Sequence, residues 1–336
     1  MGTRMPRIAT AVGNEHEAPN DPGRPHNRSP DRAAERRAAE RRTSAGATGM
    51  RIGVDVGGTK IEVALLDRAG AIAFRQRVAT PPDYDGIVRA VAGLVSAADA
   101  AAGGRASVGV GIPGTLSPAT GVVKNANTQA LIGHAMDRDL ADALSRPVRI
   151  ENDANCFALS EAVDGAGAGA RCVFGVIIGT GCGGGIVVDG RILPGRNRIA
   201  GEWGHTPLPW PHGAELPAPP CWCGQSGCLE LYVSGPGLAR QAGRDAPTLL
   251  AADDAAAALA LHTHADRLAR GLAVVMNILD PDVIVLGGGL SNMEDLYVEV
   301  PTLMARYVFS DVTITPVLPP VHGDSGGVRG AAWLWP

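Results

Sequence analysis

A glycine-rich turn between two apolar segments occurs twice in this sequence and constrains the fold more than any other feature. The first turn is DVGGTK at Asp55–Lys60, and the second is GTGCGGG at Gly179–Gly185. A short apolar run, a polar turn and a returning apolar run are typical of a β-hairpin. Glycine is the default residue of ordinary turns, so one such hairpin alone would indicate little. Because each of the two stands at the head of a segment of domain size, we predict a duplicated fold.

The remaining apolar segments predict an α/β protein with mixed sheets. The expected strands are Arg51–Val56, Lys60–Leu66, Ala71–Val78, Ser107–Ile112, Val148–Ile150, Cys172–Ile178, Ile186–Val188 and Val283–Leu286. The expected helices are Asp85–Ala101, Asp137–Leu144, Ala154–Val163, Ala256–Leu279 and Met293–Val308. We place an N-terminal domain at residues 50–165 and a C-terminal domain at residues 166–336, with hinges near Gly165–Arg171 and Gly326–Trp335.

Residues 1–49 differ in composition from the rest of the chain. They hold nine arginines and six acidic residues, many Pro, Asn, Ser and Ala, and almost no periodic apolar positions. This composition predicts a disordered extension with at most a short helix over Ala33–Arg42. A second interpretation is that translation starts at Met50, which directly precedes the first expected strand.

Composition also excludes several classes of function. A net charge of −4 gives no electrostatic basis for nucleic acid or an anionic membrane as a partner. No apolar run approaches the roughly 20 residues that span a bilayer, and no signal sequence is evident. We therefore expect a cytoplasmic protein without a membrane partner.

The first glycine turn has the chemistry of a phosphate-binding loop. Gly57 and Gly58 let the backbone N–H groups approach a polyanion. Thr59 adds a hydroxyl donor, and Lys60, one of only two lysines in the chain, adds a positive charge. Asp55 ends the first strand, where it is placed to hold a hydrated Mg²⁺ beside phosphates. The pattern is neither G-x-x-x-x-G-K-[ST] nor a strand-to-helix G-x-G-x-x-G, so we predict a hairpin-type nucleotide site.

Three cysteines lie within eight residues in CWCGQSGC, at Cys221, Cys223 and Cys228. In a chain without a secretion signal, this spacing indicates metal binding rather than a disulfide framework. Three thiolates need one more ligand to complete a tetrahedral Zn²⁺ site, and both His205 and His212 stand upstream within reach. Four protein ligands leave no open position, so we predict a structural zinc.

Six motifs resemble those of one protein superfamily. DVGGTK, IGTGCGGG and LGGGLS are similar to the ATP contacts of actin-like ATPases and sugar kinases. ENDANCFALSEA, GEWGH and CWCGQSGCLE resemble the ROK family of bacterial sugar kinases and repressors, and the resemblance covers about Arg51–Pro336. It implies a duplicated actin-like (ribonuclease H-like) ATPase fold, with two domains around a central cleft. It also implies an ATP-dependent hexose kinase that uses Mg²⁺ and a structural Zn²⁺ and forms a homodimer.

The same resemblance implies a set of site residues. It makes Asp153 the catalytic base, with Asn152 beside it on the substrate, although on the residues alone Asp153 is equally well a helix N-cap. Glu202, His205 and Glu230 would bind sugar hydroxyls, and His205 would also be the fourth zinc ligand. The implied ATP contacts are Asp55, Gly57, Gly58, Thr59, Lys60, Gly179, Thr180, Gly181, Gly183, Gly287, Gly288 and Gly289.

The Gly- and Pro-rich segment 111–129 is typical of a ligand-facing loop, in which Thr115 and Asn127 are candidate sugar contacts. SPATGVVKNANTQ, GEWGHTPLPW and HGDSGGVRGAAWLWP look most like bacterial fructokinases, some of which also accept mannose. We therefore predict that the chain converts D-fructose and ATP to fructose 6-phosphate and ADP. N-acetylglucosamine kinases and glucokinases share the general motifs, so both remain alternatives. The placement of hydrogen bonds that separates one hexose from another is not visible in a sequence.

Two hypotheses of other classes compete with the kinase. A ROK-type sugar-responsive transcriptional repressor carries a winged helix-turn-helix ahead of its kinase-like part, and residues 1–49 are too short and too rich in proline for one. A non-catalytic nucleotide-binding scaffold of the actin type lacks the zinc loop and needs no Asn152–Asp153 pair. The motifs therefore favour a sugar kinase.

Overall fold

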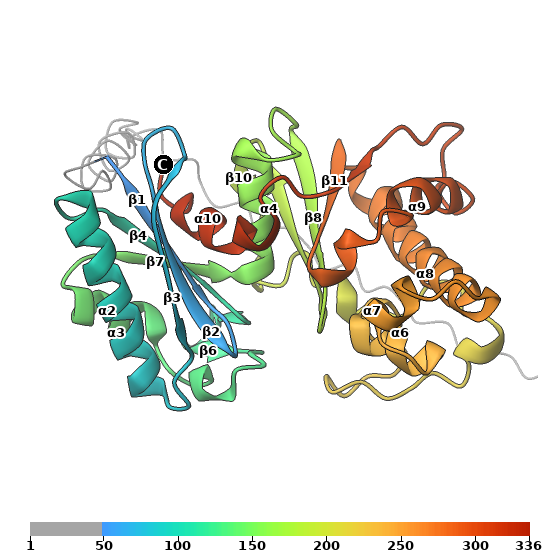
Figure 1. The fold of residues 1–336 in the computed structure, drawn as a ribbon, viewed down its shortest axis with the longest axis horizontal. Helices are drawn as coiled ribbons and strands as arrows, with labels where there is room; N and C mark the ends of the chain where they lie inside the picture. Colours follow the sequence, from blue (N-terminus) through green and yellow to red (C-terminus); the bar gives the residue numbers. More distant parts are fainter. Residues whose placement is uncertain (1–48) are drawn as a thin grey trace, which may run out of the picture. The chain divides into compact units, whose positions relative to one another are not determined.

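The computed structural model describes residues 49–336. The extension predicted at residues 1–49 lies, except for its last residue, outside the described residues, as does the short helix expected at Ala33–Arg42. The described chain contains two five-stranded sheets and a two-stranded ribbon (Figure 1). Among these residues, no helix combines the length and the apolar character needed to cross a membrane.

The two large sheets share one strand pattern, which confirms the predicted duplication. Their orders are β3–β2–β1–β4–β7 and β10–β9–β8–β11–β12. In each sheet the first three strands are antiparallel and the other two continue the sheet in parallel. The first sheet consists of β1 (Arg51–Val56), β2 (Lys60–Leu66), β3 (Ile72–Ala79), β4 (Ser107–Ile112) and β7 (Val148–Asn152). The second consists of β8 (Cys172–Ile178), β9 (Cys182–Val188), β10 (Arg191–Ile192), β11 (Val283–Gly287) and β12 (Val317–Leu318). The ribbon is formed by β5 (Thr115–Leu116) and β6 (Val123–Lys124).

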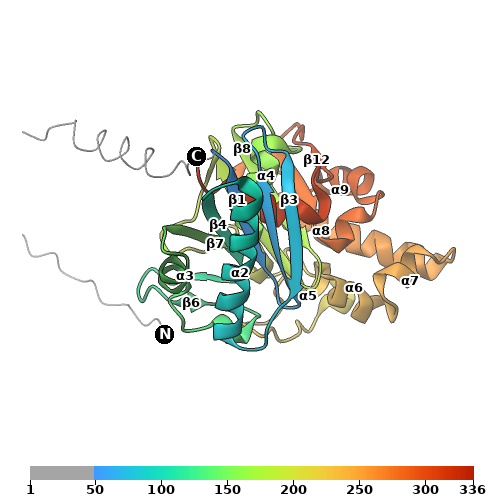
Figure 2. The same ribbon diagram turned by 60° about the vertical axis from the view of Figure 1, so that its left-hand side comes forward.

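Helices occupy matching places in the two halves. Those of the first half are α2 (Tyr84–Ala102), α3 (Met136–Leu144) and α4 (Asp153–Asp164). Those that follow are α5 (Glu230–Val233), α6 (Gly235–Ala242), α7 (Ala246–Leu250), α8 (Ala255–Leu279), α9 (Leu296–Met304) and α10 (Gly326–Ala332). α2 and α3 lie on one face of the first sheet, and α8 and α9 pack together beside the second (Figures 1 and 2). Each half has an apolar core of its own, and the division into two domains at residue 165 stays a prediction.

Helices α4 and α10 lie between the two sheets and contact each other (Figure 1). Although α10 ends the chain, it packs on β1 and β4 of the first sheet. A Cβ atom on Gly53 would lie 1.8 Å from the carbonyl oxygen of Val328, and one on Gly109 would lie 1.8 Å from that of Ala331. Glycine at these strand positions therefore lets the α10 backbone rest directly on the sheet.

One predicted boundary in the second half is wrong. We expected a glycine turn over 179–185 and a strand from Ile186, but β9 already begins at Cys182. The three glycines at 183–185 pair with β8 as ordinary strand residues. A Cβ atom on Gly185 would lie 2.7 Å from the carbonyl oxygen of Ala154 in α4. Gly183 and Gly185 make room for α4, which crosses the strand at Ala154. The turn itself is confined to 179–181.

A second boundary also differs from the prediction. The helix expected at Met293–Val308 is α9, which covers only Leu296–Met304. Beyond the end of this helix, Asn277 of α8 binds the backbone. Its side chain donates to the carbonyl oxygen of Tyr307 at 3.0 Å and accepts from the N–H of Phe309 at 2.7 Å. A long-range contact of this kind leaves no trace in the local apolar pattern.

Candidate active site and metal cluster

Residues from both halves line one pocket with a volume of about 850 Å³. The predicted site residues that line it are Asn127, Asn152, Asp153, Gly179, Thr180, Gly181, Gly183, Glu202, His205, Cys223 and Glu230. The pocket further includes residues that the sequence did not single out, among them Pro113, Gly114, Asn125, Ile199 and Trp222. Thr115 is not among its lining residues, because it is buried in β5.

Asp153 begins α4, directly after β7, which runs two residues further than expected and ends at Asn152. Asn152 is the N-cap: its side-chain oxygen accepts from the N–H groups of Ala154 at 2.9 Å and Asn155 at 3.2 Å. The Asn152 amide also donates to Asp153 Oδ1 at 3.0 Å and to the carbonyl oxygen of Gly114 at 3.2 Å. Asn152 is therefore the N-cap, although Asp153 Oδ1 also accepts from the N–H of Ala154 at 2.9 Å.

Three carboxylates in this region have raised pKa values. Burial, with the charge of Glu202 as a smaller cause, raises the pKa of Asp153 to about 6, although the hydrogen bond from the Ala154 N–H acts to lower it. Burial likewise raises the pKa of Asp55 to about 7, with additional contributions from Asp153 and Glu62. The pKa of Glu202 is also raised, chiefly by burial. A carboxylate with a pKa near neutrality, aimed into a pocket, is typical of a proton acceptor.

Asp55 lies at the end of β1, next to the start of α10. A Cβ atom on Gly327 would lie 3.5 Å from its carboxyl group, and one on Gly111 would lie 3.7 Å from its Oδ1. Asp55 does not line the pocket itself, but its pKa responds to the charge of Asp153. Mg²⁺ prefers oxygen ligands, so the half-buried carboxylate of Asp55 has the chemistry to hold this ion beside the pocket.

Two of the predicted phosphate loops, at 179–181 and 287–289, lie side by side, whereas the loop at 57–60 lies apart from the pocket. Gly179 of the second hairpin lies beside Gly289, where an added Cβ atom would come within 3.9 Å of the Gly289 nitrogen. Gly288 is also close to this hairpin, because a Cβ atom on it would lie 2.4 Å from the carbonyl oxygen of Ile178. The first hairpin, with Thr59 and Lys60 exposed, is closed by a hydrogen bond of 2.9 Å from the Gly57 N–H and does not line the pocket.

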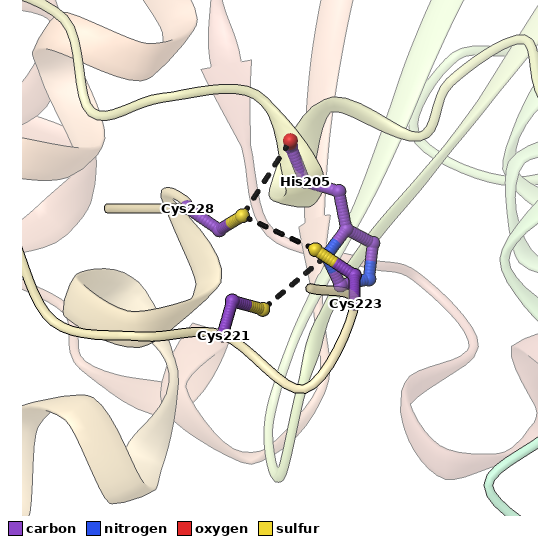
Figure 3. Close-up of side chains that lie close together, drawn as sticks. All are labelled: His205, Cys221, Cys223 and Cys228. Atoms are coloured by element: carbon purple, nitrogen blue, oxygen red, sulfur yellow. Dashed lines mark hydrogen bonds between the residues drawn. The ribbon is translucent and has the colours of Figure 1, made fainter. Parts of the chain in front are cut away.

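His205, Cys221, Cys223 and Cys228 form a cluster whose ligand atoms all lie within 4.8 Å of one another (Figure 3). The Sγ atoms of Cys223 and Cys228 are 3.6 Å apart, and Cys221 Sγ is 3.8 Å from His205 Nδ1. Sulfur atoms on a tetrahedral Zn²⁺ with bonds of about 2.3 Å stand about 3.8 Å apart. The cluster fits zinc, and the sulfur separation is far longer than a disulfide bond.

The fourth member of this cluster is His205 rather than His212. The sequence spacing allowed either histidine as the fourth ligand. Among the described residues, however, only His205 has a ring nitrogen close to the three cysteine sulfurs. His212 instead precedes a short turn, where its backbone N–H donates to Glu215 Oε2 at 3.0 Å. His205 turns Nδ1 toward the thiols (Figure 3) while it also lines the pocket.

A buried ionic group that the sequence did not reveal ties the metal loop to α8. Glu215 accepts from Arg270 Nη2 at 2.5 Å and from Arg267 Nε at 2.8 Å. All three side chains are almost fully buried. Burial alone would raise the pKa of Glu215, but the hydrogen bonds from Arg270 and Arg267 outweigh it and lower the pKa to about 2. The carbonyl oxygen of Glu215 also accepts from the Tyr232 hydroxyl at 3.1 Å.

Glu230 is less free than the sequence analysis assumed. Its Oε2 accepts from the N–H of Cys182 at 2.9 Å, and its Oε1 accepts from Trp222 Nε1 at 3.0 Å. A carboxylate has about four acceptor positions, so two remain for a ligand. Trp222 is a residue that sequence reasoning missed, because a single aromatic residue between two cysteines carries no periodic signal.

Two further contacts hold the 193–201 segment beside the pocket. Lys124 Nζ donates to the carbonyl oxygen of Asn197 at 3.3 Å, and Arg198 pairs with Glu151 at 3.3 Å. Lys124 and Glu151 belong to the first half, whereas Asn197 and Arg198 belong to the second. These contacts therefore join the two halves at the pocket that contains Glu202.

Comparisons with known proteins identify the family of this chain. The family model described as the ROK family matches residues 51–336. The N-acetyl-D-glucosamine kinase of Photobacterium profundum is 41% identical over 299 residues, which cover 85% of this chain and 99% of that protein. The N-acetylgalactosamine kinase of a Shewanella species is 40% identical over 297 residues, with 85% and 96% covered. The crystal structure of a ROK family glucokinase from Streptomyces griseus, in complex with glucose and AMPPNP, matches with a TM-score of 0.70 and 30% identity, and covers 85% of this chain and 99% of that one.

Proposed function

Because the chain belongs to the ROK family, we propose that this ATP-dependent sugar kinase phosphorylates a 2-acetamido hexose, with N-acetyl-D-glucosamine as the main substrate, at the 6-hydroxyl. The kinase assignment rests on the family and on relatives named as kinases over 85% of the chain. The choice of sugar is supported by relatives about two-fifths identical that are named for N-acetylated hexosamines. This choice departs from the sequence prediction of D-fructose, which stays the main competing substrate.

The position and the raised pKa of Asp153 are the observations that carry the proposed chemistry. Its carboxylate lines the pocket at the start of α4, where Asn152 is the N-cap, and its pKa is raised to about 6. In the reaction that we propose, the sugar O6 attacks the γ-phosphorus of ATP and a new P–O bond forms. The bond between that phosphorus and the β–γ bridging oxygen breaks, and ADP leaves. The O6 proton passes to the Asp153 carboxylate, which accepts it at a pKa suited to neutral pH.

Positioning is the second requirement of phosphoryl transfer. Gly179–Gly181 line the same pocket as Asp153, so the proposed phosphate loop and the proposed base face one space. Asp55 would hold Mg²⁺, which supplies neutralisation of phosphate charge when bound, and Asp153 stays free to accept the proton. Glu202, His205 and Glu230 would hold the sugar, and Asn127 and Asn152 lie at the same pocket.

A metal in the Cys–His cluster would be structural, since four protein ligands complete a tetrahedron. Its effect on catalysis would be indirect, because it holds the ring of His205 toward the pocket. The homodimer stays a prediction.

Phosphorylation of a panel of sugars tests the proposal. Purified protein with MgATP would be given N-acetylglucosamine, N-acetylgalactosamine, N-acetylmannosamine, glucose, fructose and mannose, with ADP release followed for each. We expect the highest kcat/KM with N-acetylglucosamine and a 6-phosphate product by NMR. A best rate with fructose would reinstate the sequence prediction, and no turnover of any hexose would refute the kinase proposal. The Asp153→Asn variant is the control, because any ADP that it releases does not depend on the proposed base.

A further inference from the structure

Trp222 presents a large apolar surface inside the pocket. It stands between the cluster residues Cys221 and Cys223, lines the pocket, and leaves 68% of its surface exposed. A large apolar side chain exposed at a binding pocket is typical of a surface that a ligand covers. The indole N–H already donates to Glu230 Oε1 at 3.0 Å, so what the ring still offers a ligand is apolar surface.

The orientation of this indole is fixed by two neighbours. Besides the bond to Glu230, the ring meets that of His205 edge-on, with 4.9 Å between centroids and an angle of 86°. Both neighbours line the pocket, and His205 belongs to the Cys–His cluster. A rigid aromatic side chain loses little entropy when a ligand binds against it, so Trp222 is prepared for a contact.

Trp222 and the base lie beside different residues of the second hairpin. Trp222 contacts His205 and Glu230, and a Cβ atom on Gly181 would lie 2.9 Å from Glu230 Oε2. Ala154, which follows the base, lies beside Gly183 instead, where an added Cβ atom would come within 3.3 Å of the Ala154 Cβ atom. The indole therefore stands with the predicted hydroxyl-binding residues rather than with the base.

The geometry of a hexose relates Asp153 to Trp222. In a pyranose ring, C2 is diametrically opposite C5, the carbon that carries C6. With O6 placed at Asp153, the substituent on C2 points away from the base and would reach the side of the pocket that Trp222 lines. A 2-acetamido group ends in a methyl, which is the one apolar group that distinguishes it from a 2-hydroxyl. Burial of that methyl against an indole is favourable, whereas a hydroxyl would gain nothing there.

We propose that Trp222 selects 2-acetamido sugars by packing its indole against the acetyl methyl. This inference rests on the proposed function and names the specificity-determining residue of the same site. Ile199, which is 47% exposed and lines the pocket, adds apolar surface. The hydroxyl-binding carboxylates hold any hexose, and Trp222 separates the acetylated ones from the rest.

The ratio of kcat/KM for N-acetylglucosamine to that for glucose tests the inference. In Trp222→Ala we expect this ratio to fall about tenfold or more, the effect of one methyl or methylene in an apolar pocket. Trp222→Phe keeps an aromatic surface but loses the bond to Glu230, so it should keep most of the ratio. Trp210→Ala is the matched control, because Trp210 is half-exposed but stacks on Tyr307 and is not among the pocket residues. It should leave the ratio unchanged.

The wild-type protein supplies a test that does not depend on the folding of a variant. N-formylglucosamine lacks only the methyl, and we expect its kcat/KM to be about tenfold below that of N-acetylglucosamine. Equal values for the two sugars would overturn the inference, and so would an equal fall for glucose and N-acetylglucosamine in Trp222→Ala. In both cases the wild type would still phosphorylate N-acetylglucosamine, so the proposed function would stand. A wild type inactive on every 2-acetamido sugar would refute the proposed function itself.

Discussion

The two halves of the described chain share a strand pattern and differ in what connects their strands. Between β3 and β4 the first half has only the helix α2, whereas between β10 and β11 the second half has the long 193–282 segment. Asp55 and Asp153 lie on regular elements, at the end of β1 and the start of α4. Glu202, His205 and Trp222 lie outside the strands and α-helices of the second half.

The difference shows two ways of fixing a side chain. Strands and helices hold their residues through backbone hydrogen bonds, so the proposed base needs no further support beyond Asn152. The long segment depends on ties between side chains, which are the Cys–His cluster and the Glu215–Arg270 pair. Substitutions in the first half should therefore change kcat at little cost in stability. Substitutions in the second should change stability and sugar binding.

The largest expected effect comes from the proposed base. Asp153→Asn should lower kcat by about 10³-fold or more, because no other group takes the O6 proton. It should also raise the apparent melting temperature at pH 7 by about 2 °C, because a buried carboxylate with a raised pKa destabilises the fold above that pKa. Steady-state kinetics and thermal unfolding measure the two effects. Asp85→Asn is the control, since Asp85 stands exposed in the first turn of α2. A loss of kcat below tenfold would contradict the role of Asp153.

Loss of the metal cluster should be the next largest effect. We expect one zinc ion per chain by mass spectrometry and its loss in Cys228→Ser, with the free energy of unfolding lowered by about 4 kcal/mol. The KM for the sugar should rise, because His205 and Trp222 are held by this loop. Cys172→Ser is the matched control, since Cys172 lies in β8 outside the cluster. Full zinc content and wild-type stability in Cys228→Ser would show that the cluster does not hold the loop.

A somewhat smaller effect should follow from Glu215→Gln. This substitution leaves the charge of Arg270 buried without its main partner, which costs about 3 kcal/mol of stability. Denaturant unfolding measures this cost. Arg244→Gln, which removes the exposed pair with Asp254, should leave the unfolding curve nearly unchanged. If the two variants were equally stable, the second half would not depend on buried side-chain ties.

The smallest effect is expected from pH alone. Asp153 is a base only when unprotonated, and its pKa is raised to about 6, so kcat/KM should be halved near pH 6 and fall about tenfold for each further pH unit. Glu215 has its pKa lowered to about 2 and stays ionised throughout this range, so its stabilising pair should persist to below pH 4. Initial rates and melting temperatures from pH 8 to 5 test both. A rate that does not change with pH would contradict the role of Asp153 as the base. A melting temperature that falls with pH together with the rate would contradict the assignment of activity to the first half and stability to the second.

The local features of this protein follow from its sequence. Glycine turns, apolar strands and the C-x-C-x₄-C spacing act over a few residues, so the duplicated fold and the metal loop could be predicted directly. The Asn152–Asp153 pair could be placed at a strand-to-helix junction for the same reason. The role of Asp153 remained balanced against capping, because which side chain turns back to the helix depends on rotamers that a sequence does not show.

Tertiary structure decided the remaining features. It joined His205 rather than His212 to the thiols, and it paired the glycines at 183–185 with β8, where Gly183 and Gly185 lie against α4. It also brought Glu215 to Arg270, 55 residues further along the chain, and set Trp222 against a pocket that both halves line. Such contacts depend on how distant elements pack, and packing is fixed only when the whole chain has found its burial and its hydrogen-bond partners.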